Sequence, residues 1–431
     1  MKKILLIAVF TIISINYAFS VTLTEALIQT YKNNTELNAE RENVKVSQKD
    51  LIISKADYLP SASITGSKSK EKTNKLTNQG GGDASITDVD PLIATIKLEH
   101  TLVDFGRDAE YKKKKIGINL AEAKLLKKEQ DIFYKAIEAY SGLILANEKL
   151  TINQINLSLL ERQVETDKVR LERGQITVSD LAQSESSLAG AQAQFIQAKN
   201  EVVTNKLNYE NIIGKILNPK SLEKTSESIV SIPQSLNSAI DLSKQNNPDI
   251  TIAKLELEQS EKDIEIAESD LKPTATLSLE RSYSDNLNTT YDKKEKDVLK
   301  ATVSWPFYSG GKKRVTISKN QNLKTRKRLL LDNAIKTNDT IVATAWANLQ
   351  SSKSFLNFVR LQVRAAQIAN EGITAEYERG SGRTTLDVIQ SNTLLLNAKV
   401  SLSNSERNYL LAQYNLLKSV GLLNSTYLKL E

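Results

Sequence analysis

Charged side chains beside glycine-containing breaks in helical sequence are the best candidates for chemistry in this chain. Arg383 and Asp387 are four residues apart, so on a helix they share one face. Asp180 follows a similar break in the first half of the chain. Such groups can form ion pairs or line a charged passage. A solvated ion pair of this kind is usually worth less than about 1 kcal/mol, so the pair by itself does not establish a function.

The sequence offers little for covalent or metal chemistry. It has no cysteine, which excludes thiol catalysis, thiolate metal sites and iron–sulfur clusters. Its one histidine, His100, leaves little material for a zinc site and is more often a packed or interfacial side chain. No nucleophile elbow is present, which argues against an exported hydrolase. We therefore expect no enzymatic activity, no cofactor and no metal.

The first twenty residues have the composition of a signal peptide. Lys2 and Lys3 precede an apolar stretch, 4–15, and small residues at Ala18 and Ser20 suit a cleavage site. The mean hydropathy of the whole chain, −0.34, is too polar for a bundle of membrane helices. With 58 Lys and Arg against 51 Asp and Glu, the net charge of +7 describes a mixed-charge surface. For an exported protein this is weak support for nucleic-acid binding, and we expect none.

The rest of the chain is an internal duplication. Pro60 corresponds to Pro273, and Gly174 corresponds to Gly380, so the two halves align at an offset of roughly 205 to 213 residues. The expected divisions are the signal peptide 1–20, a first repeat 21–216, a connector 217–236, a second repeat 237–421 and a short tail 422–431.

Each repeat has the same order of elements: a helix, two strands, a very long helix, a break and another long helix. Alternation of apolar and polar residues predicts strands at about 61–68, 92–104, 274–284 and 297–308. Polar segments at 68–90 and 285–296 are expected to be exposed loops. Proline-free stretches with large and small residues at three- and four-residue spacing predict coiled-coil helices at about 107–173, 179–213, 312–378 and 384–420.

Four amphipathic strands of about ten residues are long enough to cross a membrane as part of a tilted barrel, but too few to close one. An open edge would leave amide groups unpaired in lipid. Several copies must therefore contribute strands, and two, three or four copies all satisfy this requirement. Sequence periodicity does not choose among them.

The motifs at the element boundaries resemble those of the TolC family of outer-membrane efflux proteins. They are Leu102-Val103-Asp104-Phe105-Gly106 and Trp305-Pro306-Phe307-Tyr308-Ser309-Gly310-Gly311 at the strand-to-helix junctions, 379–388 at the second break, and 414–421 at the end of the last helix. The resemblance extends over nearly the whole mature chain. It implies a mainly α-helical homotrimer, with a twelve-stranded barrel in the outer membrane and a twelve-helix periplasmic barrel of coiled coils.

The resemblance also implies the function and the partners. It describes a passive exit duct of a tripartite efflux or type I secretion system in a Gram-negative bacterium. The partners it implies are outer-membrane lipid, a periplasmic adaptor (membrane-fusion) protein and an inner-membrane pump of the RND or ABC type. The runner-up hypothesis is a secreted coiled-coil scaffold or adhesin without a pore, which explains the long helices but not the four strands.

The same resemblance assigns roles at the breaks. Gly174, Gly380 and Gly382 would form the periplasmic tip where the adaptor docks. Arg383 would bridge to Asp180 and hold the entrance shut. Asp387 would form a ring of carboxylates, whose mutual repulsion raises their pKa. The place of a second such carboxylate is taken by Gln390, so cation selectivity should be weaker. The gate tyrosine of the family corresponds to either Tyr377 or Glu378, because this turn is one residue longer.

Aromatic and basic residues gather at the strand ends. Such residues suit the interface between lipid and water, where aromatic rings and cations contact head groups. We expect a membrane-interface girdle on the periplasmic side, alternatively a solvated helix start, formed by Phe105, Tyr111, Trp305, Phe307, Tyr308, Lys312 and Lys313.

Overall fold

The computed structural model describes residues 21–75, 85–216, 218–225, 228–286, 293–380 and 382–430, with only the backbone at 73–75 and 85–87. The expected signal peptide, 1–20, lies outside the described residues. The chain divides into two compact units. We call them the tip unit, which comprises the described parts of Met1–Asn38, Lys128–Asn247 and Asp339–Glu431, and the sheet unit, Ala39–Lys127 and Pro248–Asn338.

These units are not the two repeats expected from the duplication. Each unit contains segments of both repeats, because strands and helices of one repeat pair with those of the other. The duplication itself is visible in a pair of matched contacts. The Asn34 side chain donates to the carbonyl of Ile212 at 3.0 Å, and the Asn247 side chain donates to the carbonyl of Ser419 at 3.0 Å.

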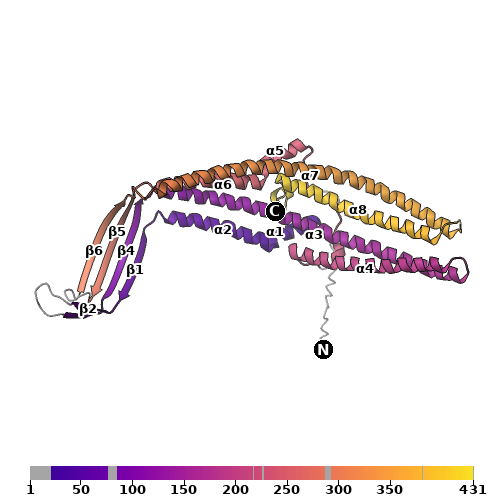
Figure 1. Ribbon diagram of the computed structural model, residues 1–431, viewed down its shortest axis with the longest axis horizontal. Coiled ribbons are helices and arrows are strands. Elements are labelled where there is room, and N and C mark those ends of the chain that lie inside the picture. Colours follow the sequence, from indigo (N-terminus) through magenta and orange to yellow (C-terminus); the bar gives the residue numbers. More distant parts are fainter. Residues whose placement is uncertain are drawn as a thin grey trace, which may run out of the picture. The chain divides into compact units, whose positions relative to one another are not determined.

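The sheet unit holds four antiparallel strands in the order β1-β4-β5-β6 (Figure 1). The central pair joins the repeats, with Leu98 of β4 opposite Leu279 of β5. β1 and β6 form the two edges and have no further strand partner among the described residues. The strands are β1 (Ser61–Lys68), β4 (Leu92–Val103), β5 (Thr274–Asp285) and β6 (Lys293–Ser304).

The exposure along β4 is the reverse of that in a water-soluble sheet. Its apolar residues Leu92, Ile96 and Leu98 are 41%, 55% and 42% exposed, whereas the alternating Lys97 and Glu99 are less accessible. In a soluble protein the apolar residues of such a strand face the core and the polar residues face water. The apolar face of this sheet is therefore available for a nonaqueous environment.

Two details of the strands differ from expectation. β6 begins and ends four residues earlier than predicted, because its polar start at Lys293 pairs with Asp285 and so continues the register with β5. The segment predicted to be a loop at 68–90 contains a hairpin of β2 (Glu71–Lys75) and β3 (Ser85–Val89). Polar residues without alternation carry no strand signal, and here backbone pairing alone defines the hairpin. Residues 76–84 and 287–292 of the expected loops lie outside the described residues.

The helices that follow the strands are very long. α3 has 66 residues and α7 has 67, and α3, α4, α7 and α8 begin and end within one residue of the predicted positions. The helices are α1 (Leu23–Asn33), α2 (Thr35–Ala56), α3 (Arg107–Glu172), α4 (Val178–Ile212), α5 (Leu236–Asn246), α6 (Pro248–Ser269), α7 (Lys312–Glu378), α8 (Thr385–Val420) and α9 (Ser425–Leu428), with a short 3-10 helix η1 (Pro219–Ser221).

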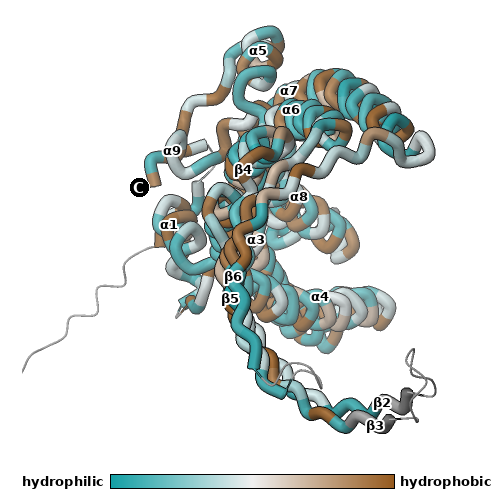
Figure 2. Tube along the Cα trace, turned by 90° about the vertical axis from the view of Figure 1, so that its left-hand side faces the viewer, coloured by the Kyte–Doolittle hydropathy of each residue, from teal (hydrophilic) through white to brown (hydrophobic). Residues whose placement is uncertain are grey.

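Apolar and polar residues are mixed along these helices (Figure 2). None of the described helices combines the length and the apolar composition needed to cross a membrane. The tip unit buries its largest side chains around Phe133, Tyr140, Tyr209 and Tyr414. The Tyr140 hydroxyl donates to the carbonyl of Val21 or Glu223, at 2.8 and 2.7 Å, and so fixes the connector against α3.

Candidate functional site

The turns between the long helices are built alike in both repeats. Gly174 after α3 and Gly380 after α7 have φ values of 68° and 75°, which favour glycine and end each helix. Thr177 then caps α4, and Thr384 caps α8. In both caps the threonine hydroxyl accepts a hydrogen bond from an aspartate N–H at 3.2 Å, and the aspartate carboxylate accepts one from the threonine N–H at 2.9 Å.

These caps give the two predicted gate carboxylates a local role. Hydrogen bonds from the Thr177 backbone and side chain hold the pKa of Asp180 below its usual range, and those of Thr384 do the same for Asp387. Within one chain the pKa of Asp387 is thus lowered, the opposite of the rise expected from a carboxylate ring. The repulsion between copies that would raise it stays a prediction. Gln390, one turn further along α8, is exposed.

Arg383 pairs with a carboxylate that the sequence did not suggest. Its Nε lies 2.6 Å from Glu376 on α7, and among the described residues it makes no ion pair with Asp180 inside the chain. The two predicted partners nevertheless line the same cavity of about 510 Å³ at the turns, together with Arg170 and Arg379. A bridge from Arg383 to Asp180 of another copy stays a prediction.

Tyr377 belongs to a buried polar network that connects four helices. Its hydroxyl donates to Asp167 on α3 at 3.1 Å and makes a 3.0 Å hydrogen bond with Thr385 on α8. The other carboxylate oxygen of Asp167 accepts a hydrogen bond from Ser184 on α4 at 2.5 Å. The Arg170 guanidinium lies over the Tyr377 ring, 4.2 Å from its centroid, in the geometry of a cation–π contact.

The central residues of this network are buried, so their hydrogen bonds matter for stability. Asp167 is 0% exposed and Tyr377 is 7% exposed, whereas Glu378 is exposed. Of the two positions considered for the gate tyrosine, Tyr377 is therefore the one held at a helix–helix contact. A buried carboxylate is costly unless hydrogen bonds satisfy it, and here Gln163 supplies a further donor at 2.9 Å.

Asp167 was not among the residues predicted from the sequence, although the sequence contains a signal for it. Leu160, Val164, Asp167 and Leu171 follow one another at spacings of four, three and four residues. This is the spacing of a coiled-coil seam, in which a carboxylate needs partners from the facing helices. The partner positions could not be identified, because Tyr377 is 210 residues away in sequence.

The aromatic residues at the strand ends are exposed in the sheet unit. Phe307 and Tyr308 are 83% and 79% exposed, and Phe105 and Trp305 are also exposed. The Trp305 indole donates to the carbonyl of Leu271 at 3.1 Å, which fixes its ring at the junction of β6. Lys312 is exposed, and the Lys313 ammonium donates to the carbonyl of Asp270. These residues are thus available for a membrane interface. Tyr111, by contrast, is half-buried, and the Lys55 ammonium lies over its ring.

No group of three or more His, Asp or Glu residues suited to a metal ion occurs in the part of the chain that the structure describes. The sites brought together by the fold are thus a polar tip and an apolar sheet face with aromatic ends.

Comparison with known proteins agrees with this arrangement. The family model described as "Outer membrane efflux protein" matches residues 26–215 and 239–422. Outer membrane efflux protein BepC of Brucella suis biovar 1 is 26% identical over 98% of this chain and 90% of its own length. The protease secretion protein PrtF of Dickeya chrysanthemi is 22% identical over 98% of this chain and 93% of its own length.

Solved structures show the same fold. The CmeC outer membrane channel of Campylobacter jejuni aligns with a TM-score of 0.80 at 16% identity, covering 93% of this chain and 85% of CmeC. VceC of Vibrio cholerae aligns with a TM-score of 0.73 at 17% identity, covering 93% of this chain and 96% of VceC. The match to both repeats, over most of the chain, shows that this protein belongs to the outer membrane efflux protein family.

Proposed function

We propose that this chain is one subunit of an outer-membrane exit duct, which passes drugs or proteins from an inner-membrane pump to the cell exterior. The observation that carries the proposal is the reversed exposure of β4, with its apolar residues on the accessible face. A sheet of this kind is stable when the apolar face contacts lipid and the polar face lines an aqueous interior.

Closure requires further copies of the chain. The edges β1 and β6 carry unpaired backbone groups, which are costly in lipid. Pairing β6 of one copy with β1 of the next would close the barrel without edges. Three copies supply twelve strands, the number implied by the family resemblance, and the long helices would continue the barrel as a periplasmic tunnel.

The tip would be the gate of this duct. Asp167 and Ser184 belong to the first repeat, and Tyr377 and Thr385 belong to the second, so the network ties the α3–α4 hairpin to the α7–α8 hairpin. Widening the passage by moving one hairpin would break the hydrogen bond between Tyr377 and Asp167. Arg383 and Asp180 would add a bridge between copies.

The exposed turns at Gly174, Gly380 and Gly382 would receive a periplasmic adaptor protein, which connects the duct to a pump of the RND or ABC type. Relatives named for protease secretion and for pyoverdine export support a role in both type I secretion and small-molecule efflux. The exposed aromatic residues Phe105, Trp305, Phe307 and Tyr308, together with Tyr111 and the lysines Lys312 and Lys313, would form the girdle at the membrane surface.

Single-channel conductance in a planar bilayer tests the duct. The purified protein should require detergent and should form pores of uniform, low conductance. A protein that stays soluble without detergent and forms no pores would overturn the proposal and leave a coiled-coil scaffold. Pores whose conductance is unchanged by Tyr377→Phe and by Arg383→Ala would keep the duct and exclude the gate.

A further inference from the structure

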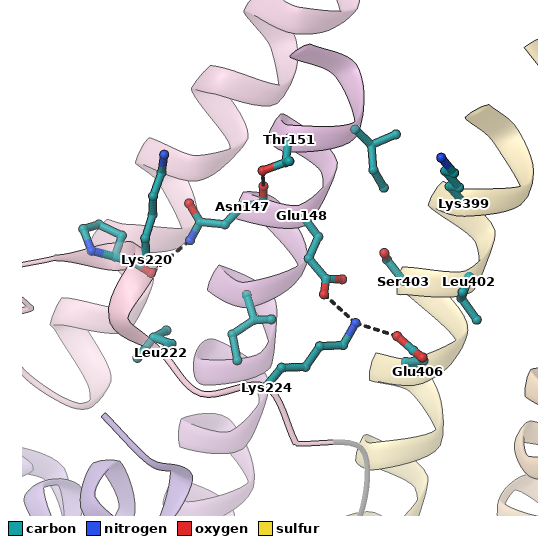
Figure 3. A pocket seen from close by; sticks show the side chains of 13 residues that line it. Asn147, Glu148, Thr151, Lys220, Leu222, Lys224, Lys399, Leu402, Ser403 and Glu406 are labelled. Atoms are coloured by element: carbon teal, nitrogen blue, oxygen red, sulfur yellow. Dashed lines mark hydrogen bonds and ion pairs between the residues drawn. The ribbon is translucent and has the colours of Figure 1, made fainter. Parts of the chain in front are cut away.

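A pocket lies in the tip unit between α3, α8 and the part of the connector that comprises η1 and the residues after it (Figure 3). Its volume of about 530 Å³ is within the range typical of small-molecule sites, roughly 300–1,000 Å³. Apolar side chains form much of its wall, and they come from all three segments: Ile144, Ile152, Pro219, Leu222 and Leu402.

The charged side chains of the pocket differ in whether they are paired within the protein. The Lys224 ammonium lies between Glu148 and Glu406, bonded to the first and 2.5 Å from the second, so both carboxylates are already paired (Figure 3). Lys220 and Lys399 stand on opposite sides of the pocket in the same view, and neither makes an ion pair with any described residue. The pocket thus has two free ammonium groups and no free carboxylate.

Two neutral polar side chains of the wall, Asn147 and Thr151, are engaged within the protein. The Asn147 amide donates to the carbonyls of Leu143 at 3.0 Å and Pro219 at 3.1 Å, and the Thr151 hydroxyl donates to the carbonyl of Asn147 at 3.0 Å. A ligand therefore gains little from extra hydrogen bonds to these two groups. It gains from burying apolar surface against the wall and from placing negative charge near the two lysines.

We propose that this pocket binds an anionic amphiphile, namely a medium-chain fatty acid. The hydrocarbon chain lies against Ile144, Leu222 and Leu402, and the carboxylate pairs with the ammonium group of Lys220 or of Lys399, on either side of the pocket. The Lys224 ion pairs close one side of the pocket and keep the two carboxylates from repelling the ligand. None of the residues that line the pocket belongs to the hydrogen-bond network of Tyr377 and Asp167.

Decanoate binding to the purified assembly, transferred from detergent into amphipol, tests the proposal by calorimetry. We expect saturable binding of decanoate and weaker binding of decanol and of decyltrimethylammonium, which have the same chain with no charge or with the opposite charge. An exposed ion pair contributes up to about fivefold, and charge reversal replaces this attraction by repulsion, so the double variant Lys220→Glu and Lys399→Glu should weaken decanoate binding about tenfold or more.

Two further variants sharpen the result. Ser403→Phe places a ring in the pocket and should abolish saturable binding. Because Ser403 is buried, gel filtration is used to check that the variant protein still assembles. Lys244→Glu with Lys254→Glu reverses two exposed charges outside the pocket and should leave the affinity unchanged. Equal binding of decanoate and decyltrimethylammonium, or an affinity unaffected by the Lys220 and Lys399 reversals, would overturn the proposal, as would the absence of saturable binding.

Discussion

Removing one hydroxyl at the tip should open the duct. The Tyr377 hydroxyl has one proton and donates it to Asp167, so Thr385 donates to the Tyr377 oxygen. Tyr377→Phe deletes both hydrogen bonds and keeps the ring, with its contact to Arg170. The buried Asp167 loses one donor but keeps Ser184 and Gln163. The change therefore weakens the connection between the two hairpins without creating a cavity.

The size of the effect follows from the charge of the acceptor. A hydrogen bond to a charged group contributes about 1.5–3 kcal/mol, and about 1.4 kcal/mol corresponds to a factor of ten in an equilibrium constant. If the bond exists only in the closed tip, its loss shifts the closed-to-open ratio of each subunit by about 10- to 100-fold. Asp167→Asn, which keeps an acceptor oxygen but removes the charge, should give a smaller shift.

Single-channel recording measures this shift directly, as a higher mean conductance or a longer open time for Tyr377→Phe than for the unchanged protein. Tyr414→Phe is the matched control, because that hydroxyl is also buried and accepts a hydrogen bond from the N–H of Ile229 at 3.1 Å, among connector residues. An unchanged conductance in correctly assembled Tyr377→Phe, or an equal rise in Tyr414→Phe, would refute the reasoning.

Three further outcomes are expected. Because the folded-state pKa of Asp180 is lowered, its cap contributes stability above the unfolded pKa of about 3.9 and loses it only as the pH falls through the lower folded value. The protection factor for amide exchange at the start of α4, which corrects for the pH dependence of the intrinsic exchange rate, should therefore be unchanged between pH 7 and about pH 5 and fall only in stronger acid. A lower protection factor already at pH 6 would contradict this. If Arg383 acts through Glu376, Glu376→Gln should raise the conductance as much as Arg383→Ala; no effect of Glu376→Gln would assign Arg383 to another partner. Replacing Trp305 and Phe307 by serine should slow insertion into lipid vesicles, since both rings are exposed at strand ends; unaltered insertion kinetics would remove them from the girdle.

Sequence periodicity predicted the helices accurately because the signal is local and repeated. Each long helix has many turns with the same apolar spacing, and its ends carry glycine, or threonine followed by aspartate, which cap a helix through contacts three or four residues away. The strands were harder to bound. At β6 the alternation is clear only from Leu299 onwards, whereas the strand begins at Lys293 because β5 is there to pair with it. Pairing partners, and not composition, decide where such a strand starts.

The candidate site shows the same distinction between local sequence signals and tertiary contacts. The sequence by itself determined that charges stand beside two corresponding glycine breaks of the duplicated halves and that no thiol exists for catalysis. Only the tertiary structure decided which charges meet. It paired Arg383 with Glu376, placed Tyr377 on Asp167, and set Lys224 between Glu148 and Glu406. Caps depend on neighbours in the chain, whereas these contacts depend on the relative rotation and stagger of packed helices, which no local pattern fixes.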